Sequence, residues 1–447
     1  MFDQNSFASF FDPEWMFGVS TGFDIVIGNP PYIQLQLNGG ELGKMYENSG
    51  FQSFTSTGDI YCLFYERGHQ LLKADGHLCY ITSNKWMRAA YGEKLRTFLA
   101  SKTNPLLLID FAGVKVFESA TVDTNILLFE KAKNAHHTIC AATSKQNRDS
   151  LKNLSVFVQQ QGTFCDFSGG DSWVILSPIE QSIKRKIEAV GTPLKDWDIN
   201  IYRGVLTGYN DAFIITTSKR DEILSNCQNE DERKRTAELI RPILRGRDIK
   251  RYGYEWANLW LINTHNGIKG KLERIHIEDY SAVKAHLDQF WDKIKDRADQ
   301  GDTPYNLRNC AYLEEFLKPK VMYPNMTKYI PFYYDTRGFY QNDKSFMITG
   351  RHIAFLTAFL NSSIFKFCFL NNFPELQGGT RELRKVFFDK IPIIQIDDKL
   401  NEQFASLISD MQNNPTVEKA KSIDELLFDV YGLTDAERDV IGFIEIQ

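Results

Sequence analysis

The stretch FDIVIGNPPYI, residues 23–33, decides the fold of the N-terminal part of this chain. Residues 23–27 form a β-branched, apolar run that ends at Gly28, as the buried strands of parallel sheets do. The tetrapeptide Asn29-Pro30-Pro31-Tyr32 follows directly. Ligands of open α/β sheets bind beyond the carboxyl ends of the strands, so the tetrapeptide is predicted to lie at a ligand site. The plainer alternative is a rigid proline turn after a strand.

The residues after this stretch alternate between helix and strand patterns. Asp59 can cap a helix whose apolar residues share one face. Short turns separate the elements that follow, and such alternation predicts an α/β fold with a doubly wound parallel sheet. The predicted elements are a helix over 60–73, a strand over 77–82, a helix over 92–100, and strands over 106–111 and 125–130.

Shifts in composition divide the chain into four parts. A partial, Rossmann-like α/β sheet comes first. A polar linker follows, in which residues 154–160 (LSVFVQQ) predict one strand. An α+β domain and a helical tail complete the chain, and Thr434 and Glu437 in the tail have the spacing of a capping box. The predicted parts are residues 1–135, 136–175, 176–396 and 397–447.

The bulk composition excludes several classes of protein. The net charge of −5 over 447 residues means that any nucleic-acid binding must come from local basic patches. Seven scattered cysteines without a CxxC pair, and eight histidines without an HExxH motif, argue against a metal site and for a reducing cytoplasm. We see no signal peptide and no apolar run of about 18 residues, so the expected location is cytoplasmic, away from membranes.

The side chains of the tetrapeptide suit one kind of chemistry. The Asn29 side-chain carbonyl and the Pro30 backbone carbonyl can accept both hydrogens of one amino group, while Tyr32 offers a flat face for stacking. An exocyclic amine on a heteroaromatic ring is a poor nucleophile, because its lone pair is delocalised. Two acceptors favour a pyramidal nitrogen, which prepares it to attack a methyl sulfonium. A base must leave the double helix to reach such a pocket.

The motif resembles the catalytic motif of S-adenosylmethionine-dependent N6-adenine DNA methyltransferases. Residues 58–100 resemble the helix, strand and loop that follow it in the γ-class enzymes, and residues 116–131 resemble a later motif whose Phe stacks on the flipped base. The resemblance implies catalytic roles for Asn29, Pro30, Tyr32 and Phe117, and a place near the cofactor for Asp59. For Phe117 the alternative is an ordinary core residue. Related tetrapeptides also serve RNA and protein-glutamine methyltransferases.

The second half resembles the target-recognition region of type II and type IIG restriction–modification methyltransferases. The similar segments include residues 200–215, 238–253 and 378–393. Residues 241–251 hold five basic residues against one acidic residue, a net charge of +4, and such clusters make phosphate contacts with double-stranded DNA. The alternative is a solvated basic face. The predicted DNA-binding residues are Arg203, Arg245, Arg247, Lys250, Arg251, Arg381 and Arg384.

The main binding loop for S-adenosylmethionine is not found. Members of the resembled family carry a Gly-rich turn before the tetrapeptide, but only 28 residues precede Asn29 here. The Gly-rich stretches at 38–43 and 168–172 do not follow a suitable strand. We therefore expect the target-base half of an active site, with a separate N-terminal methyltransferase or nuclease part as a possible partner. No PD-(D/E)xK nuclease constellation is present.

Three functions remain open at this point. The leading hypothesis is a site-specific adenine-N6 DNA methyltransferase of a restriction–modification or defence system, incomplete without upstream sequence. The second is a DNA-binding specificity module with no catalysis of its own. The third is an RNA or protein methyltransferase, against which the long basic recognition region weighs.

Overall fold

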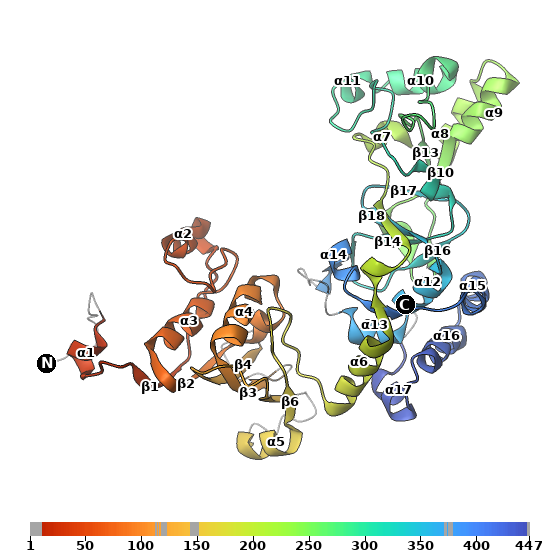
Figure 1. Cartoon of the computed structure of the whole chain (residues 1–447). Coiled ribbons are helices and arrows are strands. Elements are labelled where there is room, and N and C mark those ends of the chain that lie inside the picture. The colour runs from red at the N-terminus through yellow and green to blue at the C-terminus, as the bar shows by residue number, and fades with distance from the viewer. Residues whose placement is uncertain are drawn as a thin grey trace. The chain divides into compact units, whose positions relative to one another are not determined.

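The computed structural model describes residues 11–111, 114, 116–117, 123–143, 152–370, 373 and 379–444. Its contacts divide the chain into two compact units, Met1–Gln181 (unit 1) and Ser182–Gln447 (unit 2) (Figure 1). The four predicted parts, with a boundary between residues 175 and 176, stay a prediction.

Unit 1 is built on a six-stranded sheet with the strand order β1-β2-β4-β3-β5-β6. β1 pairs with β2, and β3 with β5, in parallel, whereas β4 is antiparallel to both of its neighbours. The α/β class is confirmed, but the predicted parallel sheet is a mixed sheet, because β4 is antiparallel to its neighbours. An apolar run predicts burial and not direction, so the sequence could not show this reversal. The strands are β1 (Phe23–Gly28), β2 (Leu72–Ser83), β3 (Asn104–Asp110), β4 (Thr124–Glu130), β5 (Thr138–Ala142) and β6 (Thr163–Cys165).

Two helices cover one face of this sheet. They are α3 (Tyr61–Leu71) and α4 (Glu93–Lys102), close to the predicted helices. Their apolar residues form one core with alternate residues of the strands, Leu78, Tyr80 and Leu127 among them. This covered face is the side on which β1 contributes Val26. Two further helices of unit 1 are α1 (Pro13–Phe17) and α2 (Leu37–Tyr46).

The segment predicted as a linker contains two strands and a helix among its described residues. β5 and β6 extend the sheet, and between them lies α5 (Leu154–Gln161), where the sequence predicted a strand. The side chain of Asn153 caps this helix by accepting a hydrogen bond from the Val156 amide at 3.2 Å, and Phe157 is buried. The cap and the packing of Phe157 outweigh the β-propensity of the Val-Phe-Val run.

Unit 2 contains two four-stranded sheets, with the orders β17-β10-β13-β9 and β16-β14-β18-β8, and three two-stranded pairs, β11-β12, β15-β19 and β20-β7. This arrangement agrees with the predicted α+β character. The strands are β7 (Gly191–Pro193), β8 (Ile199–Arg203), β9 (Ile214–Thr216), β10 (Ile240–Leu244), β11 (Ile249–Lys250), β12 (Gly253–Tyr254), β13 (Leu259–Ile262), β14 (Lys320–Pro324), β15 (Met326–Thr327), β16 (Tyr333–Asp335), β17 (Tyr340–Gln341), β18 (Ser345–Gly350), β19 (Arg381–Glu382) and β20 (Pro392–Ile394).

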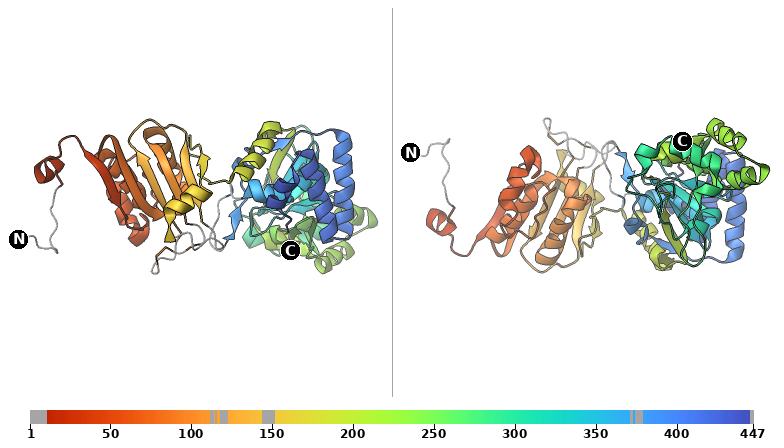
Figure 2. Two further views of the ribbon diagram at one scale, coloured as in Figure 1. Left: turned by 90° about the horizontal axis from the view of Figure 1, so that it is seen from below. Right: turned by 90° about the horizontal axis from the view of Figure 1, so that it is seen from above.

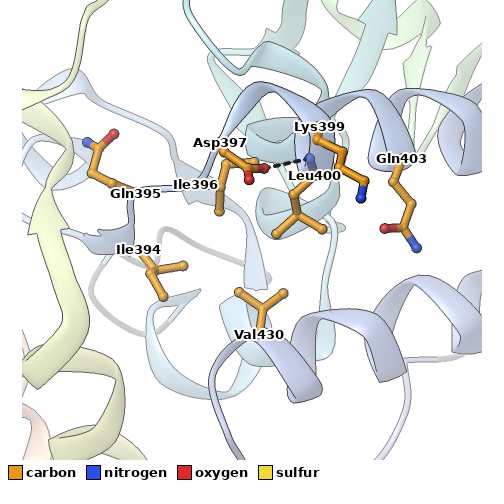
Figure 3. A pocket seen from close by; sticks show the side chains of 8 residues that line it. All are labelled: Ile394, Gln395, Ile396, Asp397, Lys399, Leu400, Gln403 and Val430. Carbon is orange, nitrogen blue, oxygen red and sulfur yellow. Dashed lines mark hydrogen bonds between the residues drawn. The ribbon is translucent and has the colours of Figure 1, made fainter.

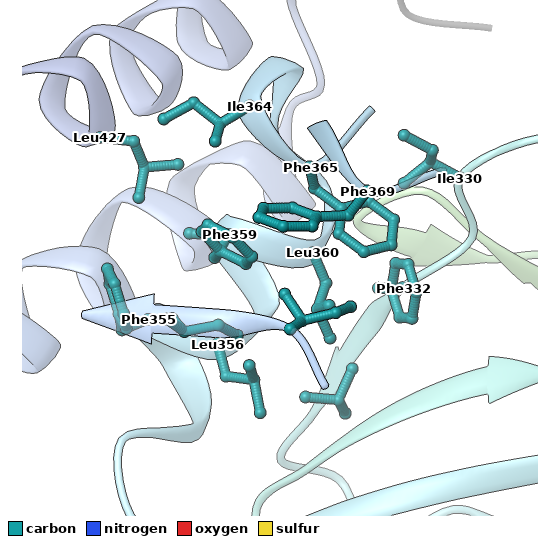
Figure 4. Close-up of a cluster of buried hydrophobic side chains, with 14 of the residues drawn as sticks. Ile330, Phe332, Phe355, Leu356, Phe359, Leu360, Ile364, Phe365, Phe369 and Leu427 are labelled. Atoms are coloured by element: carbon teal, nitrogen blue, oxygen red, sulfur yellow. The ribbon is translucent and has the colours of Figure 1, made fainter. Parts of the chain in front are cut away.

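The main core of unit 2 surrounds one fully buried helix. Every residue of α12 (Ile353–Leu360) is buried, and aromatic side chains such as Phe332 and Phe365 pack against it (Figure 4). The helices α15 and α16 of the tail close this core and lie side by side (Figure 2). The helices are α6 (Pro178–Val190), α7 (Asn210–Phe213), α8 (Thr217–Ser225), α9 (Glu230–Leu239), α10 (Ser281–Asp288), α11 (Trp291–Ile294), α12, α13 (Ser363–Cys368), α14 (Lys385–Phe388), α15 (Asp398–Asn413), α16 (Val417–Val430) and α17 (Asp435–Ile441).

The predicted capping box at the start of α17 is confirmed. The Thr434 side chain and the Glu437 side chain each bond the backbone amide of the other residue. Glu437 also accepts hydrogen bonds from Lys186 and Ser182 on α6. Burial opposes ionisation, but these donors prevail and lower the pKa of Glu437 to about 2. Across the ranges that the structure describes, no helix has the length and apolarity needed to cross a membrane.

Candidate active site and DNA-recognition surface

The carboxyl ends of four strands meet at one edge of the sheet in unit 1. β1, β2, β3 and β5 run in the same direction, as their pairings with one another and with β4 require. Asn29 directly follows β1, Asn84 directly follows β2, and Asp110 is the last residue of β3. The tetrapeptide thus lies at the edge where ligands of α/β sheets bind.

The tetrapeptide loop is fastened to the segment that precedes α3. The Ile60 amide donates to the Ile33 carbonyl at 2.9 Å, and the Leu35 amide donates to the Gly58 carbonyl at 2.8 Å. Beside these bonds Pro30 is buried, whereas the Asn29 side chain is exposed. The loop therefore holds Asn29 at the sheet edge with its side chain open to an incoming group.

Tyr32 is fixed mainly by packing. Its half-buried ring meets the ring of Tyr61 edge to face, with 6.0 Å between the centroids. The Tyr32 hydroxyl is inaccessible and has no hydrogen-bond partner among the described residues. Burial raises the pKa of Tyr32, so the phenol remains neutral. A neutral ring in a fixed orientation is suited to stacking against a base.

Asp59 belongs to a buried hydrogen-bond chain. Its carboxylate accepts a hydrogen bond from the Tyr91 hydroxyl at 3.0 Å, and the hydroxyls of Tyr91 and Tyr61 lie 2.7 Å apart. Burial is the main cause that raises the pKa of both tyrosines, so they stay protonated. The chain joins Asp59 to the residue against which Tyr32 packs, so Asp59 is placed to position the tetrapeptide loop. Its predicted contact with a cofactor stays a prediction.

A second set of polar residues lies at this edge and was not predicted from the sequence. Asn84 donates to the Asp110 carboxylate at 2.8 Å, and the guanidinium of Arg88 lies 3.5 Å from the same carboxylate. Asp110 is buried, while Arg88 is half exposed and Lys85 is exposed. The signal available in the sequence was the run of polar and basic residues directly after the strand predicted over 77–82. These cations suit contact with DNA phosphates at the mouth of the site.

Phe117, the predicted stacking residue, is half-buried. Residue 115 and residues 118–122 next to it lie outside the described residues. Its stacking on a flipped base therefore stays a prediction.

The described residues do not form a cradle for S-adenosylmethionine beside Asn29. The Gly-rich residues 38–43 lie in and around the irregular start of α2, where Asn38, Gly39 and Gly40 have positive φ, and no strand leads into them. Residues 168–172 lie in a coil after β6. Because a dinucleotide-type cradle needs a Gly-rich turn between a strand and a helix, these stretches do not fit the cofactor.

A pocket of about 430 Å³ lies elsewhere, in unit 2, between the start of α15 and the end of α16 (Figure 3). It is lined by apolar residues such as Ile394, Leu400 and Val430. Its acidic residue, Asp397, caps α15 by accepting from the Leu400 amide at 2.8 Å. No aromatic side chain lines this pocket, so it offers no stacking face for a base or a nucleoside.

Several of the predicted DNA-binding residues in unit 2 converge on one turn, residues 342–345. The Arg203 guanidinium donates to the Asp343 carbonyl at 2.9 Å. A Cβ atom on Gly246 would lie 2.9 Å from the Lys344 carbonyl, so glycine allows the segment of Arg247 to approach this turn. Arg203, Arg247 and Lys344 are all exposed.

The segment that carries Arg381 and Arg384 reaches the same turn through β15 and β19. The Lys344 carbonyl accepts from the Asn325 amide at 2.9 Å, and the Asn325 carbonyl accepts from the Leu383 amide at 2.8 Å. Arg381 is paired with Thr327, and Arg384 is exposed although it bonds Glu382. We define the Lys344 cluster as Arg203, Arg247, Lys344 and Arg384. Lys344 was not singled out from the sequence, because only the fold brings it close to the segments that carry these arginines.

Other predicted DNA-binding residues have internal partners. Arg245 binds both carboxylate oxygens of Asp248, at 2.9 and 2.8 Å. Arg251 donates to the Asn361 carbonyl at 2.9 and 3.2 Å. Lys250 lies 3.3 Å from Glu255, with both side chains exposed. Arg245 and Arg251 therefore stabilise unit 2 itself, and their contact with DNA stays a prediction.

Comparison with known proteins defines the class. The Eco57I restriction-modification methylase family matches residues 1–117, and the TaqI-like C-terminal specificity domain matches residues 241–393. The first match covers the tetrapeptide loop, and the second covers most of the Lys344 cluster. The chain is thus related to methyltransferases of restriction–modification systems, as its sequence predicted.

Individual relatives match almost the whole chain. The type II methyltransferase M.BstVI of Geobacillus stearothermophilus is 24% identical, over 94% of this chain and 75% of its own length. The type II methyltransferase M.PaeR7I of Pseudomonas aeruginosa is 22% identical, over 94% of this chain and 72% of its own length. The fold is similar to that of the type IIL restriction-modification enzyme MmeI in complex with DNA, with a TM-score of 0.50 and 13% identity. That match covers 93% of this chain and 56% of MmeI.

Proposed function

We propose that this chain is the base-binding and DNA-recognition portion of a site-specific adenine-N6 DNA methyltransferase that acts in the cytoplasm. The observation that carries the proposal is the tetrapeptide loop at the carboxyl edge of the sheet, with Asn29 exposed and Tyr32 fixed by its contact with Tyr61. The methyltransferase relatives support methyl transfer as the class of reaction. The choice of adenine as the target base is supported by the chemistry of Asn29, Pro30 and Tyr32.

The residues of the loop act on a flipped adenine. The Asn29 side-chain oxygen and the Pro30 carbonyl accept the two hydrogens of the exocyclic amine, and Tyr32 stacks on the ring. These contacts turn the nitrogen lone pair out of conjugation with the ring. S-adenosylmethionine supplies the methyl group when the complete enzyme binds it. Once the nitrogen is methylated its extra proton is acidic, so water accepts it and no general base of unusual strength is needed.

The proposal is tested by analysis of the modified base. The chain, joined or mixed with the polypeptide encoded directly upstream, is incubated with duplex DNA and labelled S-adenosylmethionine, and the digested nucleosides are separated by mass spectrometry. We expect N6-methyladenine at one short sequence. Label in RNA or protein, or as N4-methylcytosine, would contradict the proposal. DNA binding with no methylation in any combination would support the second hypothesis, a specificity module.

The Lys344 cluster supplies the second part of the proposal, contact with the DNA backbone. We expect Arg247→Ala to weaken duplex binding by a similar factor for all sequences. The plot of log affinity against log salt has a negative slope, and its magnitude should decrease by about 1, because one phosphate contact is lost. The measurement is a fluorescence-anisotropy titration at several salt concentrations. The matched control is Lys399→Ala, which removes an exposed cation on α15. An equal loss of affinity in both variants would show that the Lys344 cluster does not contact DNA.

A further inference from the structure

The loop that follows β2 closes around one buried arginine. We call residues 84–92 the β2 loop. Arg96, on α4, is only 4% exposed, and its guanidinium donates to the Trp86 carbonyl at 2.5 Å and to the Ala89 carbonyl at 2.9 Å. A Cβ atom on Gly92 would collide with the same Trp86 carbonyl, so the loop is tightly closed. Arg96 therefore fixes the path of the β2 loop.

The same guanidinium also holds a segment between β6 and α6. We call residues 167–173 the connector. Arg96 donates to the Gly170 carbonyl of the connector at 2.8 Å. The Trp173 amide donates to the Met87 carbonyl at 2.8 Å. The connector is thus bonded to the β2 loop both directly and through Arg96.

Aromatic rings bury the contact between the connector and the β2 loop. The rings of Phe167 and Trp173 are stacked, with 4.3 Å between their centroids. Trp173 meets Trp86 edge to face at 5.3 Å, and both indole side chains are fully buried. All three rings belong to the core that α3 and α4 share with the sheet. The connector is therefore packed as part of unit 1.

Tyr91 joins the β2 loop to the base-binding residues. Its hydroxyl donates to the Asp59 carboxylate at 3.0 Å and lies 2.7 Å from the Tyr61 hydroxyl. The Tyr61 ring in turn meets the Tyr32 ring edge to face. A shift of the β2 loop would therefore change the surroundings of the ring that is proposed to stack on the base.

We infer that Arg96 is a positioning residue for methyl transfer and that it acts through Tyr91. The guanidinium touches no substrate. It holds the β2 loop, the loop holds Tyr91, and Tyr91 holds Tyr61 against Tyr32. This inference rests on the proposed function. Because misplacement of a reacting group by about 1 Å can lower a rate on the order of 100-fold, loss of this hold should affect the rate more than DNA affinity.

The first test compares variants of Arg96 in the enzyme completed by the polypeptide encoded directly upstream. Arg96→Met keeps an apolar stem and removes every donor, so we expect a roughly 10- to 100-fold slower single-turnover rate with DNA affinity within about twofold. Arg96→Lys should be intermediate, since an ammonium group can donate to some of the same carbonyls. The matched control, Lys102→Met, removes an exposed cation at the other end of α4 and should keep the full rate.

A double variant separates positioning from stability. Tyr91→Phe removes only a hydroxyl and should slow transfer by a similar factor. If Arg96 acts through Tyr91, Arg96→Met/Tyr91→Phe should be within about twofold of the slower single variant. Losses that multiply in the double variant would overturn the inference. So would a lower melting temperature of Arg96→Met with an unchanged rate per DNA-binding molecule. If Arg96→Met does not fold, Arg96→Lys takes its place in the same comparison.

Hydrogen exchange on this chain alone tests the contact without methylation. The amides of Arg88, Ala89 and Gly92 bond to carbonyls within the β2 loop, and we expect them to exchange faster in Arg96→Met and in Arg96→Lys. Unchanged exchange at these amides would overturn the inference. Faster exchange, together with no N6-methyladenine from the unmodified completed enzyme, would instead contradict the proposed function and leave the hold of Arg96 on the loop standing.

Discussion

Replacing Asn29 by alanine is expected to lower DNA methylation by the completed enzyme roughly 100- to 1,000-fold, the range observed when one preorganised hydrogen-bonding group is removed from an active site. Asn29 is exposed at the sheet edge, where its side-chain oxygen can accept from the target amine. Without it, Pro30 alone cannot hold both hydrogens, and the lone pair stays delocalised. The loop itself is fastened by the backbone bonds of Ile33 and Leu35, which the substitution leaves in place.

The measurement is the single-turnover rate of methyl transfer to duplex DNA, together with the affinity for that DNA. The rate should fall while DNA affinity stays within about twofold, because the proposed recognition surface lies in unit 2 and the substitution removes only one contact, to the flipped base. Asn29→Asp should keep more activity than Asn29→Ala, since a carboxylate still accepts hydrogen bonds. Asn48→Ala, an exposed asparagine after α2, is the matched control. An unchanged rate in Asn29→Ala would refute the role given to the tetrapeptide.

The position of the tetrapeptide could be predicted because it depends on adjacent residues. An apolar strand that ends at Gly28 places Asn29 at the carboxyl edge whatever the rest of the fold does. The chain from Asp59 through Tyr91 to Tyr61 could not be predicted in this way. It links residues 32 positions apart, and only the packing of residues 84–92 beside α3 brings the hydroxyl of Tyr91 to the carboxylate.

The proposed recognition surface also combines residues that the sequence could indicate with contacts that only the fold creates. The basic residues around Arg247 were visible as a run of charge. Their relation to Lys344 depends on backbone contacts across about 100 positions, which include the close approach of Gly246 to the Lys344 carbonyl. Charge alone also did not separate Arg247, which is exposed, from Arg251, whose guanidinium is bound to the Asn361 carbonyl.

Removal of the Asp335 carboxylate is expected to give the largest loss of stability in unit 2. Asp335 and Lys320 form an ion pair at 2.5 Å with both side chains fully buried, between β16 and β14. Asp335 also accepts from the amides of Phe339 and Arg337 at 2.9 and 3.0 Å. Burial lowers the pKa of Lys320, and the nearby Asp335 opposes that shift. Asp335→Ala leaves the ammonium group without its counter-charge, which costs about 3–5 kcal/mol in the free energy of unfolding.

The double variant Lys320→Met/Asp335→Ala decides whether the lost charge balance is the cause. Methionine keeps most of the volume of lysine without its charge, so the double variant should be more stable than Asp335→Ala alone. Lys318→Met provides the surface control. Lys318 lies 2.7 Å from Glu315 and is 57% exposed, so its loss should change the unfolding free energy by less than about 1 kcal/mol. Urea denaturation monitored on the transition of unit 2 measures all three variants. If the double variant is as unstable as Asp335→Ala, the loss comes from the amide contacts of Asp335 and not from the unpaired lysine.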